Sequence, residues 1–249
     1  MRKSYLLLIL LLSPAWLGAQ NVRDTVMPLH MFSFHVSLHL PAGDIAQRYG
    51  VNMGVGGSYM FKTRSNWLIS PDFSYFSGNT FKEDSIFKPL QDEYGYYINV
   101  FGEQGMVDFF ERGFYAGLRV GKILPVFGPN KNSGLMITAS AGLLEYKTFI
   151  RQEGASIPYL IEDYLKGWDY LTNGFSMNQF IGYLHLDNDR PINFYVGLEF
   201  HQAWTRCRRD YLFNLMGPEN LDRRDFLFGI RFGWIFPVNK KTSGTYYYY

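Results

Sequence analysis

The chain has 249 residues, of which 47% are hydrophobic and 18% aromatic, and its formal net charge is +2. This hydrophobic content excludes a compositionally disordered chain, and so small a net charge gives no reason to expect a nucleic-acid partner. The single cysteine, Cys207, excludes an intramolecular disulfide framework. Beyond the first 20 residues no run approaches the ~20 apolar residues of a membrane-spanning helix.

The N-terminus has the three parts of a cleavable secretory signal. Two basic residues precede an apolar stretch from Leu6 to Leu12, which is too short to span a bilayer, and small residues follow up to Ala19. We therefore predict a signal peptide at 1–19 and an exported mature chain at 20–249. The alternative, an uncleaved signal anchor, has no Lys/Arg-rich segment after it to support it. Cys207 lies far from the cleavage site, which excludes acylation as a lipoprotein.

Eight segments of the mature chain alternate between apolar and polar or glycine residues. The first, MFSFHVSLHL, sets Phe32 and Phe34 on one face and Ser33 and His35 on the other. This period of two is typical of strands with unlike faces. It recurs at residues 52–62, 67–78, 113–124, 135–146, 175–186, 192–205 and 225–236. The segments have about 10–12 residues, close to the ~9–11 of a tilted membrane strand and longer than the ~5–6 usual in soluble sheets.

The connections between these segments alternate between long and short. TRSN, PVFGPNKNSG and DNDRP are short and turn-like, whereas the long ones are 41–51, 78–112, 147–174 and 206–224. An up-and-down membrane barrel has short periplasmic turns and long extracellular loops, while a periplasmic sandwich gives loops no reason to differ by end. The sequence therefore predicts an all-β fold, an eight-stranded antiparallel transmembrane barrel in the outer membrane, with both termini in the periplasm and an aromatic tail at 239–249.

The two faces of the predicted strands indicate which residues contact lipid and which residues fill the lumen. An arginine at the bilayer midplane costs about 2–4 kcal/mol, so charged strand residues should point inward. The interior of an eight-stranded barrel is just wide enough for side chains to fill it. We expect a plugged lumen with a polar network of Ser33, His35, Ser37, His39, Arg119, Glu199, His201 and Arg231. The expected lipid-facing or interface aromatics are Phe32, Phe34, Trp67, Trp204, Phe226, Phe228, Phe232 and Trp234.

Over essentially its whole mature length, the chain resembles small outer-membrane β-barrel proteins of Bacteroidota. The resemblance rests on the Ala19-Gln20 junction, the loop PAGDIAQRYG, the phrase LKGWDYLTNGF and the aromatic C-terminus. It implies a barrel in the outer membrane of a Gram-negative cell, and no activity for named residues. Such chains end in an aromatic residue that the assembly machinery reads. Here Tyr246–Tyr249 follows a polar segment, so either this tail or the last strand carries that signal.

Two kinds of site chemistry are weighed against lumen packing. The Ser/His face of the first segment suits nucleophilic attack on lipid, but catalysis also needs an orienting acid and an oxyanion site, and nothing in the sequence places Asp72 or Glu199 there. The histidines at 30, 35 and 39 have no carboxylate or cysteine at ligand spacing, and His185 and His201 lie on separate predicted strands. The segment GVGGSY lacks the spacing of a phosphate loop. We expect no catalytic residue, no metal and no cofactor.

We expect the long loops to carry the function, because the strands of the barrel wall only have to cross the membrane. Exposed aromatics beside charges suit recognition of a partner, and the candidate partner-binding residues are Tyr159, Tyr164, Lys166, Trp168, Asp169 and Tyr170. The same residues could instead pack against other loops, with a short helix over the barrel mouth. The basic run at 206–209 either activates the Cys207 thiol, contacts lipopolysaccharide phosphates, or surrounds an ordinary loop cysteine.

These observations lead to a ranked expectation of function. The first is a non-enzymatic structural or accessory subunit that contacts outer-membrane lipid through its wall and a protein partner through its loops, in outer-membrane assembly or secretion. The second is an outer-leaflet lipid-modifying enzyme that uses Ser/His chemistry. The third is a narrow, porin-like passive channel.

Overall fold

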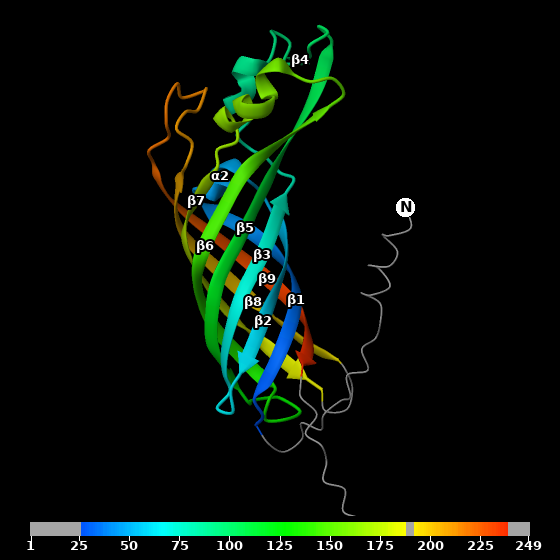
Figure 1. Cartoon of the computed structure of the whole chain (residues 1–249), viewed down its shortest axis with the longest axis vertical. Coiled ribbons are helices and arrows are strands. Elements are labelled where there is room, and N and C mark those ends of the chain that lie inside the picture. The colour runs from blue at the N-terminus through cyan, green and yellow to red at the C-terminus, as the bar shows by residue number, and fades with distance from the viewer. Residues whose placement is uncertain (1–25, 188–191, 239–249) are drawn as a thin grey trace, which may run out of the picture.

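The computed structural model describes residues 26–187 and 192–238, so the predicted signal peptide at 1–19 and aromatic tail at 239–249 lie outside the described residues. The chain forms a tall closed barrel with long loops at one end and short turns at the other (Figure 1). We name these ends the long-loop end and the short-turn end. Among the described residues, no helix has the length and apolar character needed to cross a membrane.

The sheet is a ring of antiparallel strands. The strands are β1 (Leu29–Gly43), β2 (Asn52–Lys62), β3 (Trp67–Gly78), β4 (Tyr97–Ile98), β5 (Gln104–Leu124), β6 (Gly134–Glu153), β7 (Thr172–Leu186), β8 (Asn193–Cys207) and β9 (Asp222–Val238). Their order is β3-β2-β1-β9-β8-β7-β6-β5-β4, and the additional β3–β5 pairing closes the ring. The two-residue β4 pairs with β5 outside this ring. The predicted eight-stranded up-and-down barrel is therefore confirmed.

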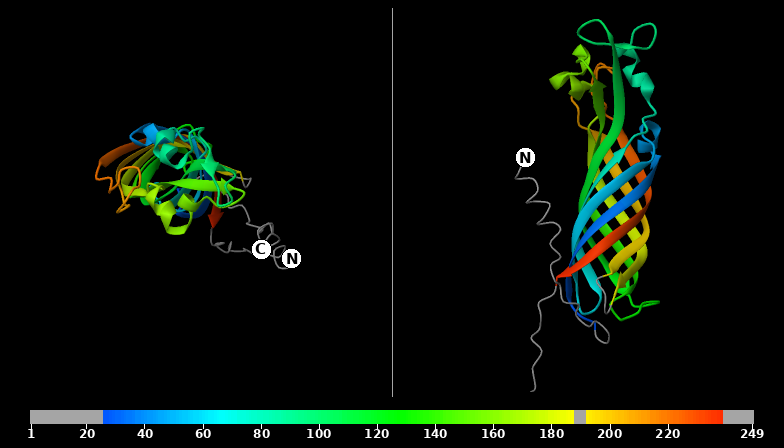
Figure 2. Two further views of the ribbon diagram at one scale, coloured as in Figure 1. Left: turned by 90° about the horizontal axis from the view of Figure 1, so that it is seen from above. Right: turned by 90° about the vertical axis from the view of Figure 1, so that its right-hand side faces the viewer.

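The loops at the long-loop end carry short helices. These are α2 (Ile45–Arg48), η1 (Asp84–Leu90), η2 (Pro158–Leu160) and η3 (Glu162–Gly167), of which the η elements are 3-10 helices. The short helix expected over the barrel mouth is thus two 3-10 turns. Seen from the side, β5 and β6 rise above the rest of the barrel beside these loops (Figure 2).

Strands β5 and β6 are longer than the sequence pattern predicts. Pairing runs from Leu124 opposite Leu135 out to Met106 opposite Glu153, so parts of the predicted loops 78–112 and 147–174 are strand. Outside the barrel one face of this hairpin packs against the loops through Val107, Phe109 and Ile150 and the other face is turned to solvent, so the alternation seen along the barrel wall ends there. Charged and aromatic cross-strand partners replace that alternation: Arg151 pairs with Asp108 at 2.6 Å and lies over the Phe110 ring.

The strands around the ring bury one face and expose the other. Along β1, Phe34 and Leu38 are exposed, while His35 and His39, the residues that follow them, are buried. The exposed residues form a band around the wall, which we call the apolar belt. It includes Phe32, Phe34, Val36, Leu38, Trp67, Phe73, Leu118, Val120, Ile137, Phe175, Ile181, Leu198, Trp204, Phe228, Ile230, Phe232 and Trp234. Phe226 shares this face, is partly covered, and stacks on Phe200.

The interior is filled in layers. A lower apolar layer at the short-turn end contains Leu29, Met31, Met60, Leu68, Ile123, Met136, Phe180, Leu184, Leu186, Tyr195 and Ile235. An upper apolar layer nearer the long loops contains Ile45, Tyr49, Phe76, Tyr115, Leu144, Tyr146, Ala203 and Leu227. The loops above have a core of their own, the cap core, with Ile86, Phe87, Tyr97, Ile150, Ile157, Leu160, Trp168, Tyr170, Cys207 and Leu212. Charged side chains lie between the two apolar layers.

Candidate functional site

The charged layer is organised around Asp72 on β3. Its Oδ2 accepts from Arg119 Nη2 of β5 at 2.7 Å and from Arg231 Nη1 of β9 at 3.0 Å. Arg231 Nη2 also lies 2.7 Å from Glu199 Oε2 of β8, and all four side chains have no solvent exposure. Two cations therefore alternate with two anions. This balance is what permits burial, because a buried charge without a partner is strongly destabilising.

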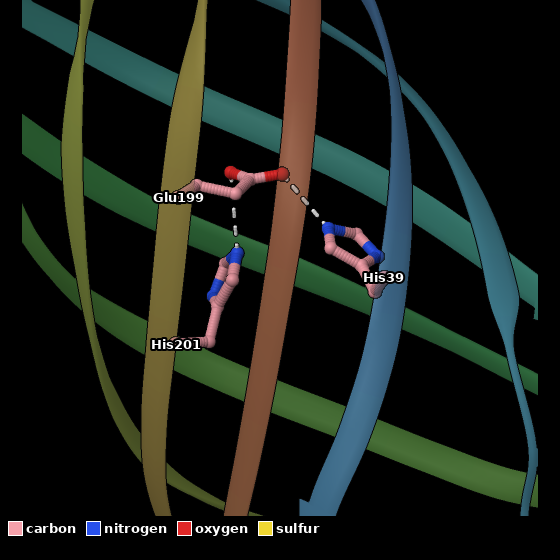
Figure 3. A group of neighbouring side chains, drawn as sticks. All are labelled: His39, Glu199 and His201. Atoms are coloured by element: carbon pink, nitrogen blue, oxygen red, sulfur yellow. Dashed lines mark hydrogen bonds and ion pairs between the residues drawn. The ribbon is translucent and has the colours of Figure 1, made fainter.

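Two histidines face the remaining side of Glu199. His39 Nε2 of β1 lies 2.8 Å from Glu199 Oε1, and His201 Nε2 of β8 lies 3.5 Å from Glu199 Oε2 (Figure 3). Strand β9 separates β1 from β8, and its Gly229 lies directly opposite both His39 and Glu199. A Cβ at that position would come within 2.5 Å of the His39 ring. Glycine at 229 therefore lets the two side chains meet across a strand.

The three ligand-type groups form a cluster. The facing nitrogen and oxygen atoms of His39, Glu199 and His201 all lie within 4.8 Å of one another, and all three residues are buried. The expectation of no metal rested partly on His201 belonging to a different strand from the other histidines. Closure of the ring removes that obstacle, because it makes β1 and β8 neighbours of the same strand.

The Ser/His face of β1 does not assemble a nucleophilic site. Ser33 Oγ donates to the Tyr195 hydroxyl at 3.3 Å, and His35 Nε2 is 2.7 Å from Ser74 Oγ. His35 Nδ1 and Ser37 Oγ have no hydrogen-bond partner among the described residues. Within residues 26–187 and 192–238, the one Ser–His hydrogen bond joins His35 to Ser74, buried between the apolar layers. It has no carboxylate on the far ring nitrogen, the position that orients a catalytic imidazole.

All eight predicted lumen residues lie on the buried face of their strands, but only five of them join one network. These five are His39, Arg119, Glu199, His201 and Arg231. Sequence reasoning missed Asp72, which holds both arginines. Two features of the sequence indicated Asp72: it lies on the inward face of its predicted strand, and the predicted lumen network contained two arginines but only one glutamate. It also missed Asn52, Glu111 and Asn178, of which Glu111 lay outside the predicted strands.

The six candidate partner-binding residues divide into surface and interior. Tyr159 and Tyr164 are exposed, and Lys166 pairs with exposed Asp163 at 2.6 Å. Trp168, Asp169 and Tyr170 are buried in the cap, which differs from the expected exposed aromatics. The reason is that the loops cover one another: Trp168 packs on Phe87 and Phe213.

Polar contacts fasten the buried part of this loop. Arg209 Nε donates to Asp169 Oδ1 at 2.7 Å and its Nη2 to Oδ2, and this hydrogen bonding raises the pKa of Arg209. The Tyr170 hydroxyl donates to Asn214 at 2.7 Å, and burial raises the pKa of Tyr170 to about 12. The guanidinium of Arg48 lies 3.9 Å from the centre of the Tyr170 ring. The cap is therefore held by specific contacts as well as by apolar packing.

The basic run at 206–209 is largely engaged within the chain. Arg206 pairs with Asp222, and Arg208 donates to Asn173. Cys207 between them is buried in the cap core. An activated thiol needs access as well as nearby cations, so this burial favours a structural cysteine.

Further aromatic residues at the long-loop end are exposed beside the predicted ones. Tyr94 is 82% exposed and Phe101 is 76% exposed, both in the loop between β3 and β5, and Tyr211 is exposed between β8 and β9. No periodic pattern marks these positions, which is why sequence reasoning passed over them. With Tyr159 and Tyr164, they form what we call the cap aromatics.

No protein-family model and no curated protein matches this sequence. Among solved structures, the chain is similar to Ail, the attachment invasion locus protein of Yersinia pestis, with 8% identity, 84% of this chain and 99% of that chain covered, and a TM-score of 0.44. Neisserial surface protein A has 8% identity, coverages of 83% and 96%, and a TM-score of 0.41. The outer membrane protein OprG from Pseudomonas aeruginosa has 10% identity, coverages of 86% and 99%, and a TM-score of 0.40. At these values, none of those proteins' properties is transferred to this chain.

Proposed function

We propose that the protein is a non-enzymatic barrel of the outer membrane whose cap binds a protein partner. The apolar belt supports the membrane location. An exposed band of apolar residues this large, encircling a closed barrel, is unfavourable in water and matches the lipid-facing surface of outer-membrane barrels. Together with the predicted export signal, it supports a wall in contact with outer-membrane lipid, long loops outside the cell and short turns in the periplasm.

The filled lumen supports a structural role over a channel. The charged layer lies between two apolar layers, and α2 contributes Ile45 to the upper one. Arg119 and Arg231 have no solvent exposure. A conducting pore needs a continuous wet path along its axis, and two apolar layers with a paired charged layer between them oppose one.

The observation that carries the proposal is that the long-loop end contains a packed cap in addition to the strands that form the wall. Spanning a bilayer requires only the eight strands, yet the long-loop end adds a separately packed cap core beneath exposed aromatics. Large aromatic side chains held on a rigid base lose little conformational entropy on binding, and they dominate protein–protein hot spots. This geometry fits an accessory subunit that presents its cap to another protein, for example in outer-membrane assembly or secretion.

Site-specific photo-crosslinking in native membranes tests the proposal. A benzophenone amino acid is placed at Tyr94, Tyr159 or Tyr164 in the cap, and at Tyr75 on the wall as the matched control, since Tyr75 is also exposed. The expected result is one discrete protein adduct from the cap positions that is missing from the wall position. The same partner should co-purify in mild detergent with the native chain and be lost from a variant with Phe101→Ala, Tyr159→Ala and Tyr164→Ala.

Two outcomes would contradict this proposal. One is the same set of adducts from cap and wall, which would indicate random collisions in the membrane. The other is an undiminished complex with the triple cap variant, which would place the contact elsewhere. Heat-modifiable gel mobility checks that each variant remains a folded barrel.

A further inference from the structure

We propose that His39, Glu199 and His201 bind one divalent transition-metal cation of the zinc type inside the barrel. Two imidazole nitrogens and one carboxylate oxygen are a recurrent ligand set for such ions. The three side chains converge from β1 and β8, their facing ligand atoms lie within 4.8 Å of one another, and all are buried. The inference concerns the lumen and is independent of the cap and its partner.

Hydrogen bonds set the tautomer of His39. Asn52 Nδ2 donates to Glu111 Oε2 at 2.9 Å, which turns the Asn52 carbonyl oxygen toward His39 Nδ1 at 2.8 Å. Nδ1 therefore carries a hydrogen, which leaves Nε2, 2.8 Å from Glu199 Oε1, as the ring nitrogen that can bind a metal ion. A metal ion between these two atoms would take the place of a proton, as metal binding to histidine generally does. The far ring nitrogen of a metal-binding histidine usually donates to a carboxylate, a backbone carbonyl or water, and the Asn52 amide oxygen is an acceptor comparable to the backbone carbonyl.

His201 faces the same carboxylate. Its Nε2 lies 3.5 Å from Glu199 Oε2, and Asn178 Nδ2 lies between the two residues, in contact with His201 Nε2 and 3.2 Å from Glu199 Oε2. Both histidines thus direct Nε2 at the two oxygens of one carboxylate (Figure 3). Asn178 Oδ1 has no hydrogen-bond partner among the described residues. On metal binding, rotation of this amide would break the two Nδ2 contacts and offer Oδ1 as a fourth ligand, and zinc prefers four-coordination.

Metal binding requires only a small movement of the ligand side chains, and Arg231 keeps a charged partner when the cation binds Glu199. Ligand atoms about 2.0–2.1 Å from a tetrahedral zinc ion lie slightly farther apart than His39 Nε2 and Glu199 Oε1 do here, so side-chain adjustments suffice. Arg231 already neutralises part of Glu199, and it retains Asp72 at 3.0 Å if the cation displaces it. Glu111 Oε1 has no hydrogen-bond partner in the described residues, and this carboxylate is linked through Asn52 to His39.

The test is metal binding by the folded mature barrel. Because the site is enclosed, the protein is refolded in detergent with Zn²⁺ or Co²⁺, passed over a chelating column, and assayed for bound metal by mass spectrometry. The expected result is one ion per chain and a higher unfolding temperature for the loaded protein. His39→Gln and His201→Gln should lose stoichiometric metal, while Asn52→Ala should weaken binding about 10–100-fold. The matched control is His185→Gln on β7, whose ring contacts Phe194 outside the cluster.

X-ray absorption of the zinc-loaded native chain gives an answer that needs no variant to fold. Two imidazoles and one or two further oxygen ligands would support the site. Absence of retained metal after refolding with Zn²⁺ would overturn the proposal. So would retention at the native level by folded His39→Gln and His201→Gln proteins, or a spectrum without imidazole ligands.

Discussion

Replacing Asp72 with asparagine should destabilise the barrel by about 3–5 kcal/mol. Asp72 joins Arg119 at 2.7 Å and Arg231 at 3.0 Å, and none of the three side chains is exposed. In Asp72→Asn, Arg231 keeps its contact with Glu199 at 2.7 Å. Arg119 keeps no carboxylate among the described residues. The variant therefore leaves one buried cation, Arg119, without a counter-charge. We expect the loss of stability that one unpaired buried charge causes, and not that of two. Because asparagine can still accept a hydrogen bond, we expect the lower part of this range.

Reversible urea unfolding in detergent micelles measures the effect, with tryptophan fluorescence and gel mobility as independent probes. A second variant, Asp72→Asn with Arg119→Met, removes both charges and should recover most of the lost stability, since replacing a buried ion pair with apolar groups is often neutral. The control is Asp163→Asn, whose pair with Lys166 is exposed and should contribute nothing measurable. A loss below about 1 kcal/mol for Asp72→Asn, or no recovery in the double variant, would refute the argument from charge balance.

Three further perturbations probe the lumen, the wall and the cap. Gly233→Ala places a methyl group within 2.2 Å of the Tyr195 ring, and overpacking should cost about 1–3 kcal/mol in the same unfolding assay. Leu38→Arg in the apolar belt should reduce the free energy of insertion into lipid vesicles by about 2–4 kcal/mol. Arg209→Ala removes both contacts to Asp169, and the lost charged hydrogen bonds, about 1.5–3 kcal/mol, should make the cap loops more sensitive to limited proteolysis while the barrel stays intact.

Each of these has a matched control. Gly217→Ala meets nothing closer than 4.0 Å and should unfold like the native protein. Tyr159→Arg, at an exposed cap position, should leave insertion unchanged. Arg206→Ala loses only an exposed pair with Asp222 and should not alter cap proteolysis. Equal effects in a variant and its control would mean that the named contact is not the cause.

The sequence by itself determined the barrel and the direction of its wall residues. Alternation along a strand is a local property, because successive side chains point to opposite faces. MFSFHVSLHL therefore separates Phe34 from His35 without reference to the rest of the chain, and the structure exposes the first and buries the second. Loop lengths then separated an up-and-down barrel from a sandwich. Where the β5–β6 hairpin leaves the barrel, the alternation fades and the predicted strands end too soon.

Only the tertiary structure decided which inward residues meet. The partners in the charged layer lie on four strands, so their contacts depend on ring closure and on the register of every pairing between them. Asp72 joins Arg231 although the residues are 159 positions apart, and His39 reaches Glu199 only because glycine occupies position 229. Likewise, Trp168 and Tyr170 are covered by other loops that no local pattern places. Strand periodicity sets the direction of a side chain, whereas its neighbours across the lumen follow from the closed geometry of the whole sheet.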